Sequence, residues 1–387
     1  MESFKNQLKV LMVTILLCLV FVTPVFAKDG YNQKIYVENT VLENLAKSLY
    51  KYYNYNSDFE EQIFSKEVLD YIKAKKRIIN HTFEENNVKK IPISSEAKIV
   101  NVDNLENGIL RYSINVTTKF KYHDTLGTES GEGVIYEFDI INKDSKNQII
   151  RYYERYNYID EDLTKSDDYN EVANHLISNF DKFKSKEESL YFLNDEITLK
   201  GLIPEIPLTE RDYIIAYARG NFNKSKPRSG DKGKTPYKDF STISGSYDCT
   251  NFVSHSLLAG GALKTRSWYF NSFSDRTSSW SGVREFYSFI NGNSGFGPSA
   301  VSVTYRPYPT NSTPTFKKGD VLQFHNGSTW RHSTIITKLY TLSYNGRSSY
   351  GAMVTGRTAP GVFNDNTKAP LIYGSNAKRV LRLTRLR

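Results

Sequence analysis

Two hydrophobic patterns follow one another in the first part of the chain. From Tyr36 to about Asn80, apolar residues recur at helical spacing in two stripes, with caps predicted at Asn39-Thr40 and at Ser65. Apolar and polar residues then alternate in four segments separated by Asn, Gly and Asp turns, which predicts strands at 97–102, 109–120, 133–141 and 147–158. Helices followed by strands indicate a small α+β domain over residues 28–165, with helices on one face of an antiparallel sheet. By analogy of fold, a cystatin-like or nuclear-transport-factor-like cone satisfies this order.

A linker separates this domain from the rest of the chain. Residues 166–207 contain one predicted short helix and end in Gly201-Leu202-Ile203-Pro204-Glu205-Ile206-Pro207, which cannot continue a helix. Thr209 is the predicted cap of the next helix, with acidic residues in its first turn. The second domain is therefore predicted to span residues 208–387.

The second domain is organised around the segment 247–261. Its apolar residues recur at helical spacing, and Gly260 and Gly261 supply a helix stop. The preceding Ser-Gly-Ser makes the approach a loop, so Cys249 is predicted at the N-terminus of a helix. Unpaired N–H groups and the helix dipole favour a thiolate there, as a nucleophilic cysteine requires. A buried structural cysteine is the alternative.

The N-terminal 27 residues have the pattern of a secretory signal. Lys5 and Lys9 precede an apolar run at 10–22, which is too short to span a bilayer comfortably, and Val25-Phe26-Ala27 offers a cleavage site. We expect an exported protein with no membrane span after cleavage. Removal of the signal also removes Cys18 and leaves Cys249 as the one cysteine. An unpaired cysteine in a secreted protein favours a reactive thiol.

The charge of the chain is basic. The full sequence has 51 − 42 = +9, and loss of Lys5, Lys9 and Glu2 leaves 49 − 41 = +8. A basic secreted protein is attracted to anionic polymers, of which a bacterial cell wall is the obvious one. Nucleic acid fits the charge but not the export signal, so the sequence argues against it as a partner.

The cysteine segment carries a resemblance to a known family. Asp248-Cys249-Thr250-Asn251-Phe252-Val253-Ser254, followed by Ala259-Gly260-Gly261, resembles the signature of the bacterial putative amidase domain family. Those domains are related to papain-like cell-wall cysteine peptidases, so the resemblance implies an α+β fold in which the Cys helix packs on an antiparallel sheet. It covers roughly the last 180 residues. His255 stands where the family usually has glutamine, and Asp248 is a possible supporting residue.

The same resemblance suggests the general base. Segments 318–324 and 330–337 resemble the family's paired strands, in which the histidine before Ser-x-Ile-Ile-Thr is the base; here it is His332. An imidazole within hydrogen-bond reach of the sulfur takes its proton and later gives it to a leaving amine. A structural histidine is the alternative. Asp320 is not predicted as the orienting residue, because an Asp in such a turn usually bonds its own backbone.

The third member of the site departs from the family. On the strand 350–358 the family typically has a histidine followed by Ser or Thr, whereas this chain has Arg357-Thr358. An arginine cannot accept a bond from an imidazole N–H. Arg357 is therefore either a clamp for a substrate carboxylate or a sign of catalytic decay. Asn364 and Asp365 lie close behind and are weaker candidates for the residue that orients the imidazole.

Aromatic residues supply the candidate substrate contacts. Trp268, Trp280 and Trp330 are the tryptophans of the chain and are the predicted cleft residues. The long Gly-, Asn-, Ser- and Pro-rich segment 291–314 is predicted as a loop that forms a cleft wall, with a plain surface loop as the alternative.

Metal chemistry is the competing enzymatic account. His255, His325 and His332 lie in one domain with Cys249, but zinc sites generally show tighter ligand spacing, so we expect no metal or cofactor. The sequence thus predicts a secreted cysteine amidohydrolase or peptidase that cleaves amide bonds of cell-wall peptides. The alternatives are a decayed wall-binding or spore-coat-type protein, and acyl transfer in which an amine replaces water.

Overall fold

The computed structural model describes most of the chain beyond the predicted signal. The described residues are 38–125, 127–143, 146–179, 206–232, 234–243, 246–325, 329–344, 346–369 and 378–387. The predicted signal at 1–27 and most of the predicted boundary segment at 201–207 lie outside them. Among the described residues, no helix has the length and apolar character needed to cross a membrane.

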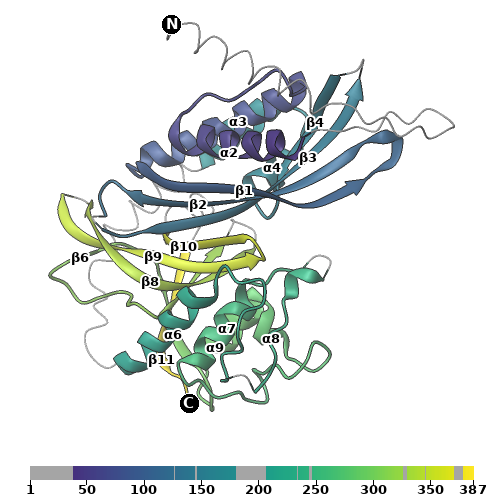
Figure 1. Cartoon of the computed structure of the whole chain (residues 1–387). Helices are drawn as coiled ribbons and strands as arrows, with labels where there is room; N and C mark the ends of the chain where they lie inside the picture. The colour runs from purple at the N-terminus through teal and green to yellow at the C-terminus, as the bar shows by residue number, and fades with distance from the viewer. Residues whose placement is uncertain are drawn as a thin grey trace, which may run out of the picture. The chain divides into compact units, whose positions relative to one another are not determined.

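The N-terminal part packs two long helices on a four-stranded antiparallel sheet (Figure 1). Its elements are α2 (Asn39–Tyr55), α3 (Lys66–Glu85), β1 (Lys90–Asn104), the 3-10 turn η1 (Glu106–Gly108), β2 (Leu110–Tyr122), β3 (Ser130–Lys143), β4 (Lys146–Glu154) and α4 (Tyr158–Leu163). The apolar stripes of α2 and α3 and one face of the sheet form a core that includes Leu49, Ile72 and Phe138. The α+β order predicted from periodicity is therefore present.

The caps differ from the prediction at one of the two helices. The Ser65 side chain accepts a bond from the N–H of Val68 and so begins α3 as predicted. The cap residue of α2 is Glu38, which makes no side-chain capping bond. Burial of the apolar stripe, rather than a cap, fixes that helix end.

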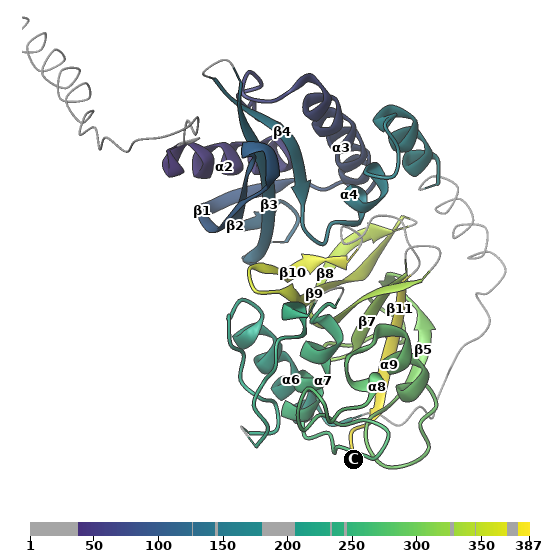
Figure 2. The ribbon, with the colours of Figure 1, turned by 90° about the vertical axis from the view of Figure 1, so that its right-hand side faces the viewer.

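The C-terminal part packs helices against a second group of strands (Figure 2). The helices are α6 (Leu208–Asn221), the 3-10 turn η2 (Phe240–Thr242), α7 (Cys249–Ala259), α8 (Ser278–Ser281) and α9 (Val283–Ile290). The strands are β5 (Ser299–Thr304), β6 (Tyr308–Pro309), β7 (Val321–His325), β8 (Trp330–Tyr344), β9 (Arg347–Ala359), β10 (Val362–Lys368) and β11 (Lys378–Arg385). Residues 169–179 form the short helix predicted in the linker.

The two groups of strands join in one antiparallel sheet, where the sequence predicted two. The order is β1-β2-β3-β10-β9-β8-β7-β11-β5, with β4 on β3 and β6 on β9. The junction is the pairing of Phe363 in β10 with Gly133 in β3. A Cβ on Gly133 would lie 2.5 Å from the Phe363 ring, so only glycine permits this approach. The pairing also satisfies backbone groups of β3 that would otherwise form an exposed edge.

Two local predictions need correction. The segment 291–314 contains β5 and β6 and is not one long loop, because β5 pairs with β11. The helix α6 begins at Leu208 with Pro207 as its cap residue, so Thr209 lies inside the helix.

Candidate active site

The N-terminus of α7 is fixed between the strands β8 and β9. The N–H of Asp248 donates to the carbonyl of Thr358 at 2.9 Å, and the hydroxyls of Thr250 and Ser333 lie 3.0 Å apart. Gly261, with φ 98°, ends the turn after the helix as the glycine pair predicted. Cys249 is thus the first residue of α7 and lies against the sheet.

The sulfur of Cys249 is buried, with 1 % of the residue exposed. Its neighbours are the Thr250 hydroxyl, at 3.8 Å, and the backbone N–H groups of Thr250 and Ser333. Burial raises the pKa of the Cys249 thiol, and the donors from Ser333 and Thr250 only partly offset this. This shift favours the neutral thiol, whereas the helix dipole was expected to favour the thiolate.

The structure places His332 on the face of β8 that points away from α7. Successive side chains of a strand point to opposite faces, and the neighbouring Ser333 hydroxyl faces α7. The His332 ring lies beside Phe324, with centroids 6.0 Å apart, and its Nε2 lies 3.2 Å from where a Cβ on Gly356 would be. Burial lowers the pKa of His332 to about 3, so the imidazole is neutral. The structure thus brings the Cys249 sulfur to the backbone N–H of Ser333, the residue after His332.

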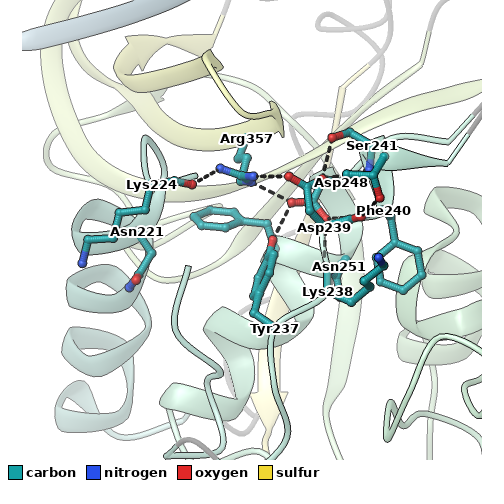
Figure 3. Close-up of polar contacts among 12 residues, drawn as sticks. Asn221, Lys224, Tyr237, Lys238, Asp239, Phe240, Ser241, Asp248, Asn251 and Arg357 are labelled. Atoms are coloured by element: carbon teal, nitrogen blue, oxygen red, sulfur yellow. Dashed lines mark hydrogen bonds and ion pairs between the residues drawn. The ribbon is translucent and has the colours of Figure 1, made fainter. Parts of the chain in front are cut away.

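The carboxylate of Asp248 accepts four hydrogen bonds. The donors are Arg357 Nε at 2.7 Å, the Tyr237 hydroxyl at 2.6 Å, Asn251 Nδ2 at 2.9 Å and the backbone N–H of Phe240 at 3.1 Å (Figure 3). Burial raises the pKa of Asp248 to about 6, with the nearby Asp239 adding to the effect. The carboxylate is ionised at neutral pH, and it holds the loop before Cys249 against the start of the helix.

All three guanidinium nitrogens of Arg357 donate hydrogen bonds in this network. Its side chain is 0 % exposed, and its guanidinium also donates to Asp239 Oδ2 at 2.6 Å and to the carbonyl of Lys224 (Figure 3). Cross-strand register explains the position, because Arg357 in β9 shares the α7 face with Ser333. The guanidinium is therefore directed into the interior of the domain, and it serves neither His332 nor a substrate.

A pocket of about 520 Å³ opens beside Cys249. Its nine lining residues come from the start of α7 and from the loops and short helices around it: Phe240, Ser246, Tyr247, Cys249, Arg276, Ser278, Ser281, Gly282 and Val283. The sulfur thus lies at the wall of a space large enough for part of a peptide. Hydroxyl groups and one guanidinium give this pocket a polar, positively charged character.

The N-terminal part of the chain contacts the rim of this pocket. Glu161 of α4 accepts from the Tyr247 hydroxyl at 3.3 Å and lies 3.6 Å from the Arg331 guanidinium. Tyr156, with φ 61°, packs its ring edge-on against Tyr247 at 5.4 Å. Tyr247 lies two residues before Cys249 and Arg331 lies next to His332. The segment from β4 to α4 therefore helps to hold both halves of the candidate site.

Two of the predicted cleft tryptophans lie in the core. Trp268 and Trp280 are 0 % exposed. Trp280 Nε1 donates to Asn251 at 2.6 Å, and Trp268 Nε1 donates to Ser254 at 3.2 Å. Both indoles therefore orient α7 from inside the core, and they do not line the Cys249 pocket. Trp330 is half-buried and stacks on Tyr287.

The histidines considered for a metal site have separate positions. The N–H of Gly230 donates to His255 Nδ1 at 3.1 Å, and burial lowers the pKa of His255 to about 3. His325 packs edge-on against Trp330. Within the described ranges, no three His, Cys, Asp or Glu residues are grouped to hold a metal ion. Asp320 pairs with Arg211 at 2.6 Å and Asp365 accepts from Thr355, so both carboxylates serve the scaffold.

Sequence reasoning missed three residues that shape the site. Ser333 and Tyr247 lie inside the segments 330–337 and 247–261, but the motifs assign them no role there, and Arg276 lies in no motif. The pocket lining and the contact of Ser333 with the sulfur identify them in the folded chain. The nearest signal in the sequence was position, because Tyr247 flanks the cysteine motif and Ser333 follows His332.

Comparison with known proteins bears on the C-terminal part alone. No curated protein and no solved structure matches the chain. A model of the putative amidase domain family matches residues 209–382, which begin at α6 and end in β11. This match confirms the resemblance carried by the cysteine segment and indicates amide hydrolysis as the chemistry of the family. Residues 209–382 are therefore similar to the putative amidase domain family.

Proposed function

We propose that the chain is a cysteine-dependent amidase or peptidase, with Cys249 as the nucleophile. The observation that carries the proposal is the position of Cys249, at the start of α7 and at the wall of a 520 Å³ pocket, inside a segment that matches an amidase family. The sulfur attacks the amide carbonyl, the amine leaves, and water hydrolyses the thioester. The backbone N–H of Cys249 is a candidate donor to the oxyanion.

His332 is the proposed base. It corresponds to the histidine of the family pattern and lies next to Ser333, whose backbone N–H reaches the sulfur. A neutral imidazole can accept the thiol proton, and burial keeps His332 neutral. Because the ring faces away from α7, the proposed proton transfer requires the ring and the end of β8 to rearrange. The proposed mechanism requires no cofactor.

The proposed substrates are peptides of the bacterial cell wall. The predicted signal at residues 1–27 would export the protein, and the net charge of +8 that remains after its removal would hold the protein near anionic wall polymers. We propose a secreted or wall-associated location on these grounds.

Hydrolysis of isolated wall peptides, followed by mass spectrometry of the new termini, tests the proposal. We expect Cys249→Ala and His332→Ala each to lower kcat/KM by at least about 10³-fold, because members of one catalytic unit act non-additively. His123→Ala, at an exposed position of the N-terminal part, is the matched control and should keep full activity. Undiminished turnover by Cys249→Ala would refute the cysteine mechanism.

A second candidate is a wall-binding protein that has lost catalysis. The observation that favours it is Arg357, which stands where the family has a histidine and is fully engaged with Asp248 and Asp239. This candidate predicts that wild-type protein and Cys249→Ala bind isolated walls equally and that neither releases new termini. Adding a free amine to the assay separates hydrolysis from acyl transfer, because transfer would give the amide of that amine.

A further inference from the structure

We propose that Arg276 is a specificity-determining residue that binds a carboxylate of the peptide attacked by Cys249. The inference deepens the proposed function and rests on it. It assigns a substrate class: peptides with a free C-terminal or side-chain carboxylate close to the scissile amide.

Arg276 supplies the charge of the Cys249 pocket. Among the nine lining residues it is the one basic residue, and the same lining includes the hydroxyl residues Ser246, Ser278 and Ser281. A cation and hydroxyl donors that line the same pocket suit an anionic oxygen pair. The pocket that holds the nucleophile is thus built for a negatively charged group.

Aromatic rings hold the guanidinium in place. Its central carbon lies 4.1 Å from the centroid of the Phe273 ring and 5.0 Å from that of Phe240. One terminal nitrogen donates to the carbonyl of Phe273. Stacking covers the faces of a guanidinium and leaves edge N–H groups for a two-pronged bond to a carboxylate. The N–H of Phe240 donates in turn to Asp248, so the buried Arg357–Asp248 network supports this wall of the pocket.

The described part of the chain provides no carboxylate for Arg276. The adjacent Asp275 accepts from Asn271 at 3.0 Å and is not among the partners of Arg276. Two other arginines of this domain show the contrast, because Arg357 pairs with Asp248 and Arg211 pairs with Asp320, all in buried positions. A half-buried arginine without an internal counter-ion, next to a nucleophile, is suited to bind an external one.

Binding of two matched peptides tests the inference. The probes are N-acetyl-diglycine and its amide, which differ in one carboxylate, titrated into the full chain carrying Cys249→Ala so that nothing is consumed. Dissociation constants come from ligand-observed NMR. We expect the acid to bind about fivefold to tenfold more tightly than the amide, as for a charge-assisted bond that is partly exposed to water.

The variants locate the effect. Arg276→Gln should abolish the preference for the acid, and Arg276→Lys should keep part of it. The control is Arg284→Gln, which changes an exposed arginine of α9 outside the pocket and should keep the whole preference. Any of three results would overturn the inference. They are equal affinity for acid and amide with Arg276 present, no measurable binding of the acid, and an unchanged preference for the acid in Arg276→Gln. Hydrolysis by the wild-type chain is measured separately, so loss of the carboxylate preference and loss of the proposed activity are distinguishable.

Discussion

The guanidinium of Arg357 donates to the carboxylate of Asp248 at 2.7 Å, and both side chains are 0 % exposed. Asp248 is the residue before the candidate nucleophile, so this ion pair ties β9 to the start of the Cys helix. The two functions considered for Arg357, a substrate clamp and a remnant of a lost triad, both assume a guanidinium facing the pocket or the imidazole. The observed pair gives Arg357 a structural task.

The first prediction is that Arg357→His destabilises the fold. Loss of the guanidinium leaves the buried Asp248 and the partly buried Asp239 without their counter-ion, which costs about 3–5 kcal/mol in the free energy of unfolding. Urea denaturation measures this, and Arg284→Gln on the exposed face of α9 should change stability by less than about 0.5 kcal/mol. A stable Arg357→His protein with faster turnover would instead support the decayed triad.

A double-mutant cycle isolates the pair. Asp248→Asn combined with Arg357→Gln removes both charges, so the double variant should lose less stability than the sum of the two single variants. Additive losses would show that the two side chains contribute independently.

The regular parts of the fold could be predicted from the sequence. The periodicity of α2 and α3, the alternation in β2 and the cysteine motif with its glycine stop each depend on neighbours within a few residues. The position of Cys249 at a helix N-terminus followed from the same local signals.

The remaining features depend on contacts between residues that are far apart in the sequence. The pairing of Phe363 with Gly133 joins two strand groups across more than half the chain, and no local pattern marks it. Burial of Trp268 and Trp280 follows from their bonds to Ser254 and Asn251 of α7. The side of β8 that His332 faces depends on strand register, where a shift of one residue exchanges the two faces.

The second prediction concerns the reactivity of Cys249. Because burial raises the pKa of its thiol, the rate of alkylation by iodoacetamide should rise with pH to a midpoint above the ordinary cysteine value of about 8.5. Mass spectrometry of the peptide containing residue 249 gives the rate, and the same protein unfolded in urea provides the control with an ordinary midpoint. A midpoint below pH 8 in the folded protein would show that the substrate-free site already holds a thiolate.

The third prediction is a pH dependence of stability caused by His332. Its pKa is about 3 in the folded chain and about 6.5 in an unfolded one, so the unfolded state binds more protons between these values. The neutral imidazole therefore contributes stability that is present above pH 6.5 and is lost as the pH falls, by about 2–3 kcal/mol between pH 6.5 and 4.5. Urea titrations of the wild type and His332→Gln at both pH values measure the difference.

The control for this prediction is His123→Gln, because His123 is exposed and should leave the pH dependence of the wild type unchanged. His255, also with a pKa of about 3, should give His332→Gln a remaining slope in the same direction. Identical slopes for the wild type and His332→Gln would mean that the His332 ring is solvated.

The fourth prediction is that Glu161→Ala impairs the candidate site from the N-terminal part of the chain. Glu161 bonds the Tyr247 hydroxyl and lies 3.6 Å from Arg331, so its loss frees the pocket rim on both sides. The side chains in these contacts are partly exposed, and we expect a loss of global stability below about 1 kcal/mol. In contrast, KM for wall peptides should rise about twofold to fivefold, because binding must then order the rim. The matched control is Asp162→Ala in the same helix, whose carboxylate pairs with Lys165 beyond the helix end; this variant should leave KM unchanged. If Glu161→Ala and Asp162→Ala have the same KM as the wild type, the contact between α4 and Tyr247 serves the scaffold and not the site.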